Sequence, residues 1–238
     1  MADYLSPPNP DDPRNAVDDS PLIPTRMLMN LSFDCRYRES LWPLKDLQLE
    51  PEYQLAATST IDGLVPFADF RIAWNEKGIV FSVAVTGRNE PPRCDPNRPD
   101  SGEAVQLFID TRDVHSVHRA TRYCHRFAFL PTGAGAKKNK AAAVWLPINR
   151  ARAHPNTVPA GSVAVAVSIA DDGYKIAGRL DAAALTGFDP DQFPKLGFNY
   201  AIVDHRQGVQ SLSVGTPMPT DEDPSLWSSL TLTGGSED

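Results

Sequence analysis

Side chains that could do chemistry gather in one stretch of this 238-residue chain, residues 100–131. Three of the five histidines lie there, at His115, His118 and His125, and Cys124 directly precedes the last of them. Imidazole nitrogens and thiolates are ligands that zinc prefers. The stretch is therefore a candidate zinc site, although neither a CxxC nor an HExxH pattern accompanies it.

Carboxylates follow the same stretch and suggest a second kind of metal. Calcium takes six or more oxygen ligands, which clustered aspartates and glutamates can supply. The alternative is that these carboxylates pair with the many neighbouring arginines, and the number of arginines favours such ion pairs. The metal-ligating candidates taken together are His115, His118, His125, Asp110 and Asp113, and the further carboxylates are Asp95, Asp100 and Glu103.

No catalytic motif stands out elsewhere in the chain. A GxSxG pattern is absent, and no order of serine, histidine and aspartate singles out a triad. No pair of carboxylates is preferred for glycoside hydrolysis. The sequence therefore predicts a protein that is not an enzyme, with a metal-dependent hydrolase as a minority alternative.

The residues around Arg126 are predicted to form a β-strand, in which alternate side chains share a face. The face that carries His125 is largely aromatic, so we expect His125 at the edge of the core, bonded to a neighbour. Arg126 belongs to the opposite face, where Gln106 of the preceding strand is also expected to point. Gln106 and Arg126 are therefore the predicted ligand-facing pair. The aromatic face consists of Tyr123, His125, Phe127 and Phe129.

A period of two runs through most of the chain, with turn residues at short intervals and almost no helical periodicity. This pattern predicts an all-β protein, an antiparallel β-sandwich of immunoglobulin- or jelly-roll-like architecture. Asn75 to Gly78 reads as a hairpin turn. The alternating runs are residues 70–74, 79–85, 105–109, 163–169, 174–180, 196–202, 212–214 and 230–232.

Composition divides the chain into three parts. Residues 1–25 are rich in proline and aspartate and are expected to form a disordered arm. Residues 26–233 are expected to form one β-sandwich domain, and residues 234–238 a tail. The cysteines, Cys35, Cys94 and Cys124, do not suggest a disulfide framework.

Charge and hydropathy limit the kinds of partner that we expect. The net charge of −7 disfavours binding to nucleic acid. No apolar run approaches the length that spans a bilayer, and the first residues do not resemble a signal peptide. We therefore expect a soluble, cytoplasmic protein without nucleic-acid or membrane partners; a protein partner stays open.

Three segments of the chain stand out together. They are the hairpin FRIAWNEKGIVFSVAV (70–85), the strand EAVQLFIDTRD (103–113) and the closing segment from GYKIAGRLDAAALTGFDP through LGFNYAIVDH to PSLWSSLTL (173–232). In this order they resemble family 9 carbohydrate-binding modules, which belong to the wider DOMON-like superfamily. The resemblance covers roughly residues 27–233. It implies a β-sandwich that binds carbohydrate and that can hold structural calcium.

The resemblance also shows where this chain departs from the family. The family's sugar site has two stacked aromatic residues, but residues 87–102 and 210–214 contain none. Gln106 stands where the family has glutamate, and Arg126 matches its polar strand residue. Trp42 and Trp145 each have a proline nearby, so either can lie at a loop edge. Trp145 or Tyr123 is predicted to supply the apolar contact that the missing pair would give.

Some DOMON-like domains hold haem between methionine and histidine. Met27, Met29 or Met218 with His125 or His205 would be the candidates here, although methionine more often fills gaps in a core. The resulting prediction is a non-catalytic domain that binds a carbohydrate or other small polar ligand, with no cofactor apart from a structural calcium. The alternatives are an interaction or structural domain without a small-molecule site and, as minority views, the hydrolase or a haem-binding domain.

Overall fold

A computed structural model describes residues 23–100, 102–215 and 218–235. Most of the predicted N-terminal arm and of the C-terminal tail lies outside these residues. The 3-10 helices are η2 (Thr25–Leu28), η3 (Lys45–Leu47), η4 (Pro51–Tyr53), η5 (Thr58–Asp62), η6 (Ala182–Ala184) and η7 (Pro224–Leu226). The strands are β1 (Ser32–Tyr37), β2 (Ala68–Asn75), β3 (Gly78–Thr86), β4 (Ala104–Asp110), β5 (Cys124–Ala134), β6 (Lys140–Leu146), β7 (Val163–Ala170), β8 (Gly173–Asp181), β9 (Lys195–Asp204), β10 (Gly208–Ser211) and β11 (Ser228–Thr233).

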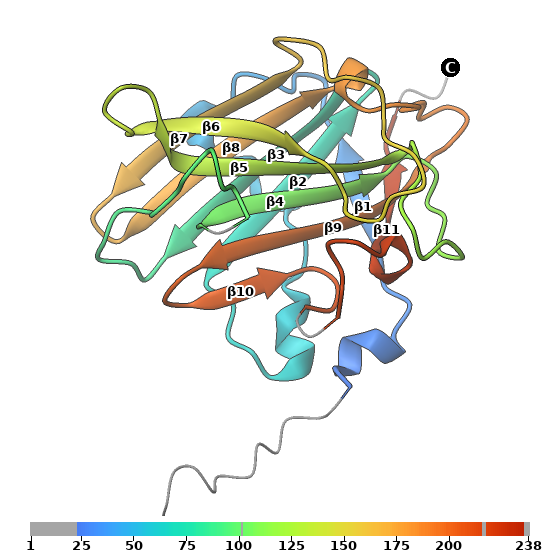
Figure 1. The fold of residues 1–238 in the computed structure, drawn as a ribbon, viewed down its shortest axis with the longest axis horizontal. Helices are drawn as coiled ribbons and strands as arrows, with labels where there is room; N and C mark the ends of the chain where they lie inside the picture. The colour runs from blue at the N-terminus through green and yellow to red at the C-terminus, as the bar shows by residue number, and fades with distance from the viewer. Residues whose placement is uncertain (1–22, 101, 216–217, 236–238) are drawn as a thin grey trace, which may run out of the picture.

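The strands form one sheet that curls back on itself into two layers (Figure 1). The order is β6-β5-β4-β9-β11-β1-β2-β3-β8-β7, with β10 paired to β9. The first layer holds β6, β5, β4 and β9, the second holds β2, β3, β8 and β7, and β11 and β1 join them at one edge. The outermost strands, β6 and β7, contact each other. The predicted β-sandwich is confirmed.

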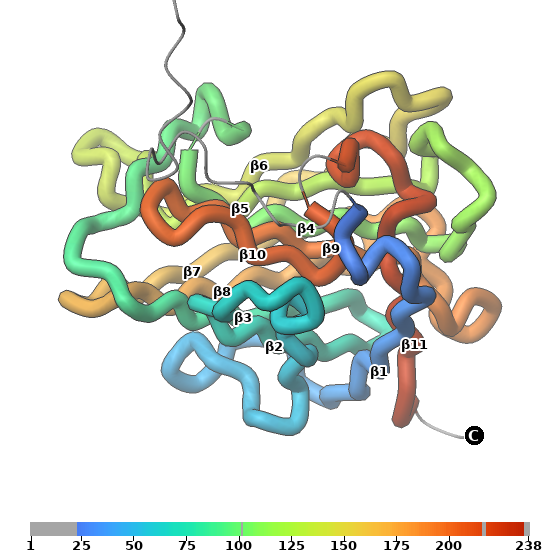
Figure 2. Tube along the Cα trace, turned by 90° about the horizontal axis from the view of Figure 1, so that it is seen from below, coloured from blue at the N-terminus to red at the C-terminus, as the bar shows by residue number. Residues whose placement is uncertain are grey.

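The sheet is mixed rather than purely antiparallel, which corrects the sequence prediction. β1 runs parallel to β11 on one side and to β2 on the other, while the other neighbouring strands are antiparallel. Figure 2 shows β1 and β11 side by side. A parallel pair needs a long crossover, and residues 38–67 supply it between β1 and β2.

The predicted hairpin turn is confirmed. Asn75 pairs with Gly78, so Glu76 and Lys77 form a two-residue loop between β2 and β3. Gly78 has a φ of +142°, and a Cβ there would collide with the carbonyl oxygen of Leu180. Only glycine fits this place, where β8 passes close to the turn.

Aromatic side chains join the two layers in the core. Phe70 of β2 stacks on Tyr200 of β9 with ring centroids 4.1 Å apart. Phe81 of β3 meets the edge of Phe129 of β5 at 4.6 Å. Aromatic pairs of this kind add to the free energy of burial, so these contacts help to fix how the layers lie on each other.

Two predictions of local structure were wrong in detail. His125 lies in the core rather than at its edge: it is fully buried, and among the described residues neither ring nitrogen makes a hydrogen bond of normal geometry, although the backbone of Thr186 lies near the ring. Residues 212–214 were expected to form a strand, but β10 ends at Ser211. Leu212 and Val214 are nevertheless buried, as their alternation indicated.

Candidate functional site

Gln106 and Arg126 come together on the outer face of the first layer. They project from the neighbouring strands β4 and β5, where Gln106 pairs with Ala128 and Phe108 pairs with Arg126. Nε and Nη2 of Arg126 both donate to Oε1 of Gln106, at 3.2 and 2.9 Å. Gln106 and Arg126 are each only 6% exposed. The pair therefore forms a fixed floor rather than a mobile surface.

Further contacts hold Arg126 from its other sides. Nη2 donates to Oδ1 of Asp100 at 2.8 Å, and Nη1 lies 3.7 Å from Oδ2 of Asp221. The guanidinium carbon lies 5.4 Å from the centre of the Phe108 ring. Phe108 in turn packs on Trp227. Arg126 is thus oriented by two carboxylates, an amide and an aromatic ring.

A cleft of about 440 Å³ opens above this floor. β4, β5, β9 and β10 form its base, and residues 214, 215, 218, 220 and 221 contribute to one wall. Its polar lining includes Asp100, Gln106, Arg126, Asn149, Asn199 and Asp221, and its apolar lining includes Phe108, Val209, Val214 and Met218. A concave site with apolar walls and a few oriented polar groups is the usual form of a small-ligand site.

The structure does not bring Trp145 or Tyr123 to this cleft. Trp145 of β6 pairs with Phe127 and packs against the core, on the opposite face of the sheet. Tyr123 precedes β5 and lies under Arg112, whose guanidinium carbon is 4.2 Å from the tyrosine ring. The apolar lining of the cleft includes Phe108, Val209, Val214 and Met218 instead.

The histidines of the 100–131 stretch lie in three different environments. His125 is in the core, where burial lowers its pKa to about 4. Nε2 of His115 lies 2.8 Å from Asp113 and 2.9 Å from Ser229. His118 is exposed, with Nδ1 2.9 Å from the Ser225 hydroxyl. They do not converge on a common metal position.

Neither of the two serine–histidine–aspartate contacts is arranged as a catalytic triad. In a triad, one ring nitrogen of the histidine faces the nucleophile and the other faces the carboxylate. Here Nε2 of His115 contacts both Asp113 and Ser229. In the same way, Nδ1 of His118 contacts both Asp223 and Ser225. Proton transfer through the ring is therefore not set up in either group, and both contacts fasten the loop after β4 to the chain near β11.

Cys124 is also poorly suited to bind zinc. Burial, together with the nearby Asp110 charge, raises the pKa of its thiol to about 11. The thiolate is the form that binds metal or attacks an electrophile, and it is scarce near neutral pH at such a pKa. All three cysteines, Cys35, Cys94 and Cys124, are free thiols.

The expected ion pairs between Asp110 or Asp113 and the loop arginines are not found among the described contacts. Asp110 accepts hydrogen bonds from the backbone N–H groups of Arg112 and Val114, each at 3.0 Å. Burial nevertheless raises the pKa of Asp110 above its usual value. The guanidinium of Arg112 lies between the rings of Tyr123 and Phe193. Asp110 therefore stabilises its own turn instead of pairing with a side chain.

A different group, Glu103, Asp204 and His205, brings metal-ligating atoms within 4.8 Å of one another. Arg88 lies between the two carboxylates: Nη2 is 3.0 Å from Glu103, and Nη1 donates to Asp204. Burial by itself would raise the pKa of Glu103, but hydrogen bonds from Arg88, His205 and the backbone of Arg93 outweigh it and lower the pKa.

The four carboxylate oxygens of this group are already occupied as acceptors. Those of Glu103 accept from Arg88, Arg93 and His205, and those of Asp204 from Arg88 and from the backbone of Arg206 and Gln207. A calcium ion would need these oxygens and would repel Arg88. The group therefore fits an ion-pair network better than a calcium site.

The haem candidates do not form a methionine–histidine pair. Met27 and Met29 are exposed and line a pocket to which no histidine contributes. Met218 lines the cleft, but neither His125 nor His205 does. The described residues therefore do not fit a haem held between one methionine and one histidine.

Comparisons with known proteins give information on the fold. No family model matches the sequence, and no curated protein matches it. A family 9 carbohydrate-binding module from Caldicellulosiruptor kristjanssonii in complex with cellotriose has a similar structure, with 12% sequence identity and a TM-score of 0.57. The match covers 87% of this chain and 96% of that one. This chain has the fold of a family 9 carbohydrate-binding module.

A structure of such a module from the same organism with glucose gives the same result. The identity is 12%, the TM-score is 0.58, and the match covers 87% of this chain and 98% of the other. At this identity the likeness concerns the fold alone, since one fold hosts many functions. The fold that the family 9 resemblance implied is confirmed, whereas the likeness to DOMON domains stays a prediction. In the described part of the chain, no helix is long and apolar enough to cross a membrane.

Several lining residues of the cleft were not predicted from the sequence. Asn149, Asn199 and Asp221 come from three distant segments, and nothing in the local pattern marks Asn149 or Asn199. The run of acidic residues at 221–223 was the one available signal, because exposed carboxylates are common ligands of hydroxyl groups. Only the tertiary structure brings Asn149, which follows β6, Asn199 of β9 and Asp221, which follows β10, to the same cleft as Arg126.

Proposed function

We propose that this protein is a non-catalytic module that binds a neutral saccharide, or a similar polyhydroxylated ligand, in the cleft above Gln106 and Arg126. The observation that carries the proposal is the buried contact between these two side chains, with Asp100 beside them. It presents hydrogen-bond donors and acceptors in fixed positions on one surface.

Sugar hydroxyls suit this arrangement because each is both a donor and an acceptor. The carboxylates of Asp100 and Asp221 can accept from hydroxyls, and charged acceptors make stronger hydrogen bonds than neutral ones. The side chains of Gln106 and Arg126 can donate. Val209 is 48% exposed and offers apolar contact to the C–H groups of a ring.

The charges of the cleft favour a neutral ligand over an anionic one. Arg126 is the one cationic side chain in the described lining, and two carboxylates, Asp100 and Asp221, accompany it. An added anion would meet a net negative surface. The similar structures support the same class, since they contain glucose and cellotriose, which are uncharged.

Isothermal titration calorimetry with glucose and cellotriose tests the proposal. We expect saturable binding that Arg126→Ala and Asp221→Asn weaken at least tenfold. Arg93→Ala is the matched control, because Arg93 is 71% exposed and lies outside the cleft lining. Asp221 is about half exposed, so its substitution tests the cleft even if removal of the buried Arg126 disturbs folding.

The alternative is an interaction or structural domain with no small-molecule site. It predicts no heat of binding with either sugar and no glycan bound on a broad array. A cooperative thermal melt of the same sample would show that the protein is folded. Such a result would overturn the saccharide proposal. Binding that is equally strong in the Arg126→Ala, Asp221→Asn and Arg93→Ala variants would keep a saccharide ligand but remove it from this cleft.

A further inference from the structure

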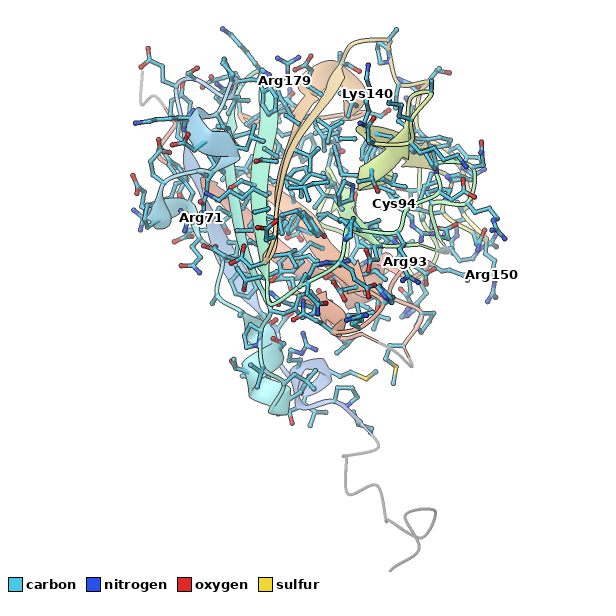
Figure 3. All side chains as sticks on the ribbon, turned by 90° about the vertical axis from the view of Figure 1, so that its left-hand side faces the viewer. Arg71, Arg93, Cys94, Lys140, Arg150 and Arg179 are labelled. Atoms are coloured by element: carbon cyan, nitrogen blue, oxygen red, sulfur yellow. The ribbon has the colours of Figure 1, made fainter. Side chains whose placement is uncertain are left out.

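A separate pocket of about 390 Å³ lies on the outer face of the second layer. It forms where the loop after β1 crosses the β2–β3 hairpin and the end of β8. Its lining includes Glu39, Trp42, Asn75, Lys77, Arg179 and Asp181. In Figure 3, Arg179, which lines this pocket, is at the top of the molecule. The pocket shares no lining residue with the cleft above Gln106 and Arg126, so the two sites are distinct.

The pocket is held in shape by a buried amide. Nδ2 of Asn75 donates to the carbonyl oxygens of Arg38 and Glu39, at 3.1 and 3.0 Å. Oδ1 of the same side chain accepts from the backbone N–H of Lys77 at 2.9 Å. Asn75 is 2% exposed. It therefore fastens the loop after β1 to the hairpin, and the pocket exists without a ligand.

Trp42 supplies an aromatic surface to this pocket. Part of its side chain packs against the small apolar cluster that contains Leu41, Leu44 and Leu49. Other parts line the pocket, and the residue is half-buried. By contrast, Trp74 and Trp227 are 5% and 3% exposed. Packing against this cluster restrains the indole, which lowers the entropy cost of a contact with a ligand in the pocket.

Charged groups of both signs surround the indole. Nε of Arg179 lies 2.8 Å from Oδ1 of Asp181, and these side chains are 27% and 34% exposed. Lys77 and Glu39 are exposed residues of the same pocket lining. Two cations and two carboxylates leave the pocket with no net charge, while they offer strong donors and acceptors around one apolar surface.

We propose that the Trp42 pocket is a second saccharide-binding site, in which a neutral pyranose ring packs on Trp42 and its hydroxyls bond to the Arg179–Asp181 pair. A pyranose has apolar C–H faces and polar edges, which matches an aromatic surface ringed by charged groups. The ligand class is the one proposed for the cleft, but the residues that would bind it are different.

Two distinct sites have a consequence for polymers. The two sites share no lining residue, so we expect each to bind a short oligosaccharide independently. A polysaccharide surface or a second polymer strand can engage both, and linked binding then raises the apparent affinity without any new contact. We therefore expect a larger gain in affinity from oligomer to polymer than one site alone would give.

Fluorine NMR of protein labelled with 5-fluorotryptophan tests the second site. Trp42→Phe assigns the Trp42 signal, and glucose or cellotriose is titrated into the labelled protein. We expect the Trp42 signal to shift saturably in the wild type and equally in Arg126→Ala and Asp221→Asn. Arg179→Met should weaken this shift at least fivefold, while Arg93→Ala should leave it unchanged.

Three outcomes separate this inference from the proposed function. A Trp42 signal that stays unchanged with both sugars overturns the second site, whatever the cleft does. A shift that disappears in the cleft variants also overturns it, because the effect would then come from the cleft. A shift that persists in the cleft variants while Trp42→Phe shows no residual heat of binding supports the second site and overturns the cleft.

Discussion

Arg126 donates two hydrogen bonds to a single atom of Gln106, the amide oxygen Oε1. A guanidinium has donors and no acceptor, so this contact fixes which way the amide faces. The Nε2 group of Gln106, with its two N–H donors, must point away from Arg126. No side chain in the described ranges accepts from it. Gln106 therefore offers donors to the cleft beside the acceptor that Asp100 provides.

Gln106→Glu tests this orientation. The new carboxylate can still accept both hydrogen bonds from Arg126, but it has no donor for a ligand. We expect the affinity for cellotriose to fall about tenfold, since a hydrogen bond of this kind contributes about 1 kcal/mol or somewhat more. The melting temperature should change little, because the contact with Arg126 is kept. Calorimetric titration and a thermal melt give both quantities, and unchanged affinity would contradict the assigned orientation.

The alternation of side chains predicted the floor of the cleft. Residues on one face of a strand recur with a period of two, so Gln106 and Arg126 were placed outward as soon as Leu107 and Phe127 were placed inward. The same argument put His125 on the inner face. It could not give the depth of burial, which depends on the layer packed against that face.

Features that depend on contacts between distant segments could not be read from local pattern. β1 lies between β11 and β2, and this placement became visible only with the topology. Trp145 was chosen for its nearby proline, but its pairing with Phe127 turns it to the core. The Trp42 pocket forms only where the loop after β1, the β2–β3 hairpin and the end of β8 meet. The side chain of Asn75 joins the first two of these segments, but the sequence identifies Asn75 only as a turn residue.

Arg88→Met should destabilise the protein strongly. Arg88 bridges Glu103 and Asp204, and all three side chains are at most 5% exposed. Removing the cation leaves two carboxylates close together and buried, a change that typically costs about 3–5 kcal/mol. Urea unfolding of the variant measures the loss. In the double variant Arg88→Met/Glu103→Gln, one of these charges is gone, so part of the stability should return; equal losses in both variants would argue against a charge effect.

Removal of divalent cations should leave the stability unchanged. The carboxylate oxygens of Glu103 and Asp204 already accept hydrogen bonds, and Arg88 would repel a cation between them. We expect the melting temperature with excess EDTA to match that with millimolar calcium chloride within about 1 °C. A bound ion would instead stabilise the folded state in proportion to its concentration. A calcium-dependent rise in melting temperature would therefore reveal an ion site that these contacts do not predict.

His125 should make the protein lose stability as the pH falls through the mildly acidic range. Burial lowers the pKa of His125 from 6.5 to about 4 in the folded state, so the unfolded chain binds a proton more readily than the folded one. Stability is therefore unaffected by this group above pH 6.5 and is lost progressively as the pH falls from 6.5 to about 4. The total loss should be about 3 kcal/mol. His125→Leu keeps an apolar side chain in the core and cannot be protonated, so its free energy of unfolding should fall less over the same range. Denaturant unfolding of both proteins at a series of pH values gives the difference, in which the other titrating groups cancel; parallel curves for the two proteins would show that His125 is not the group responsible.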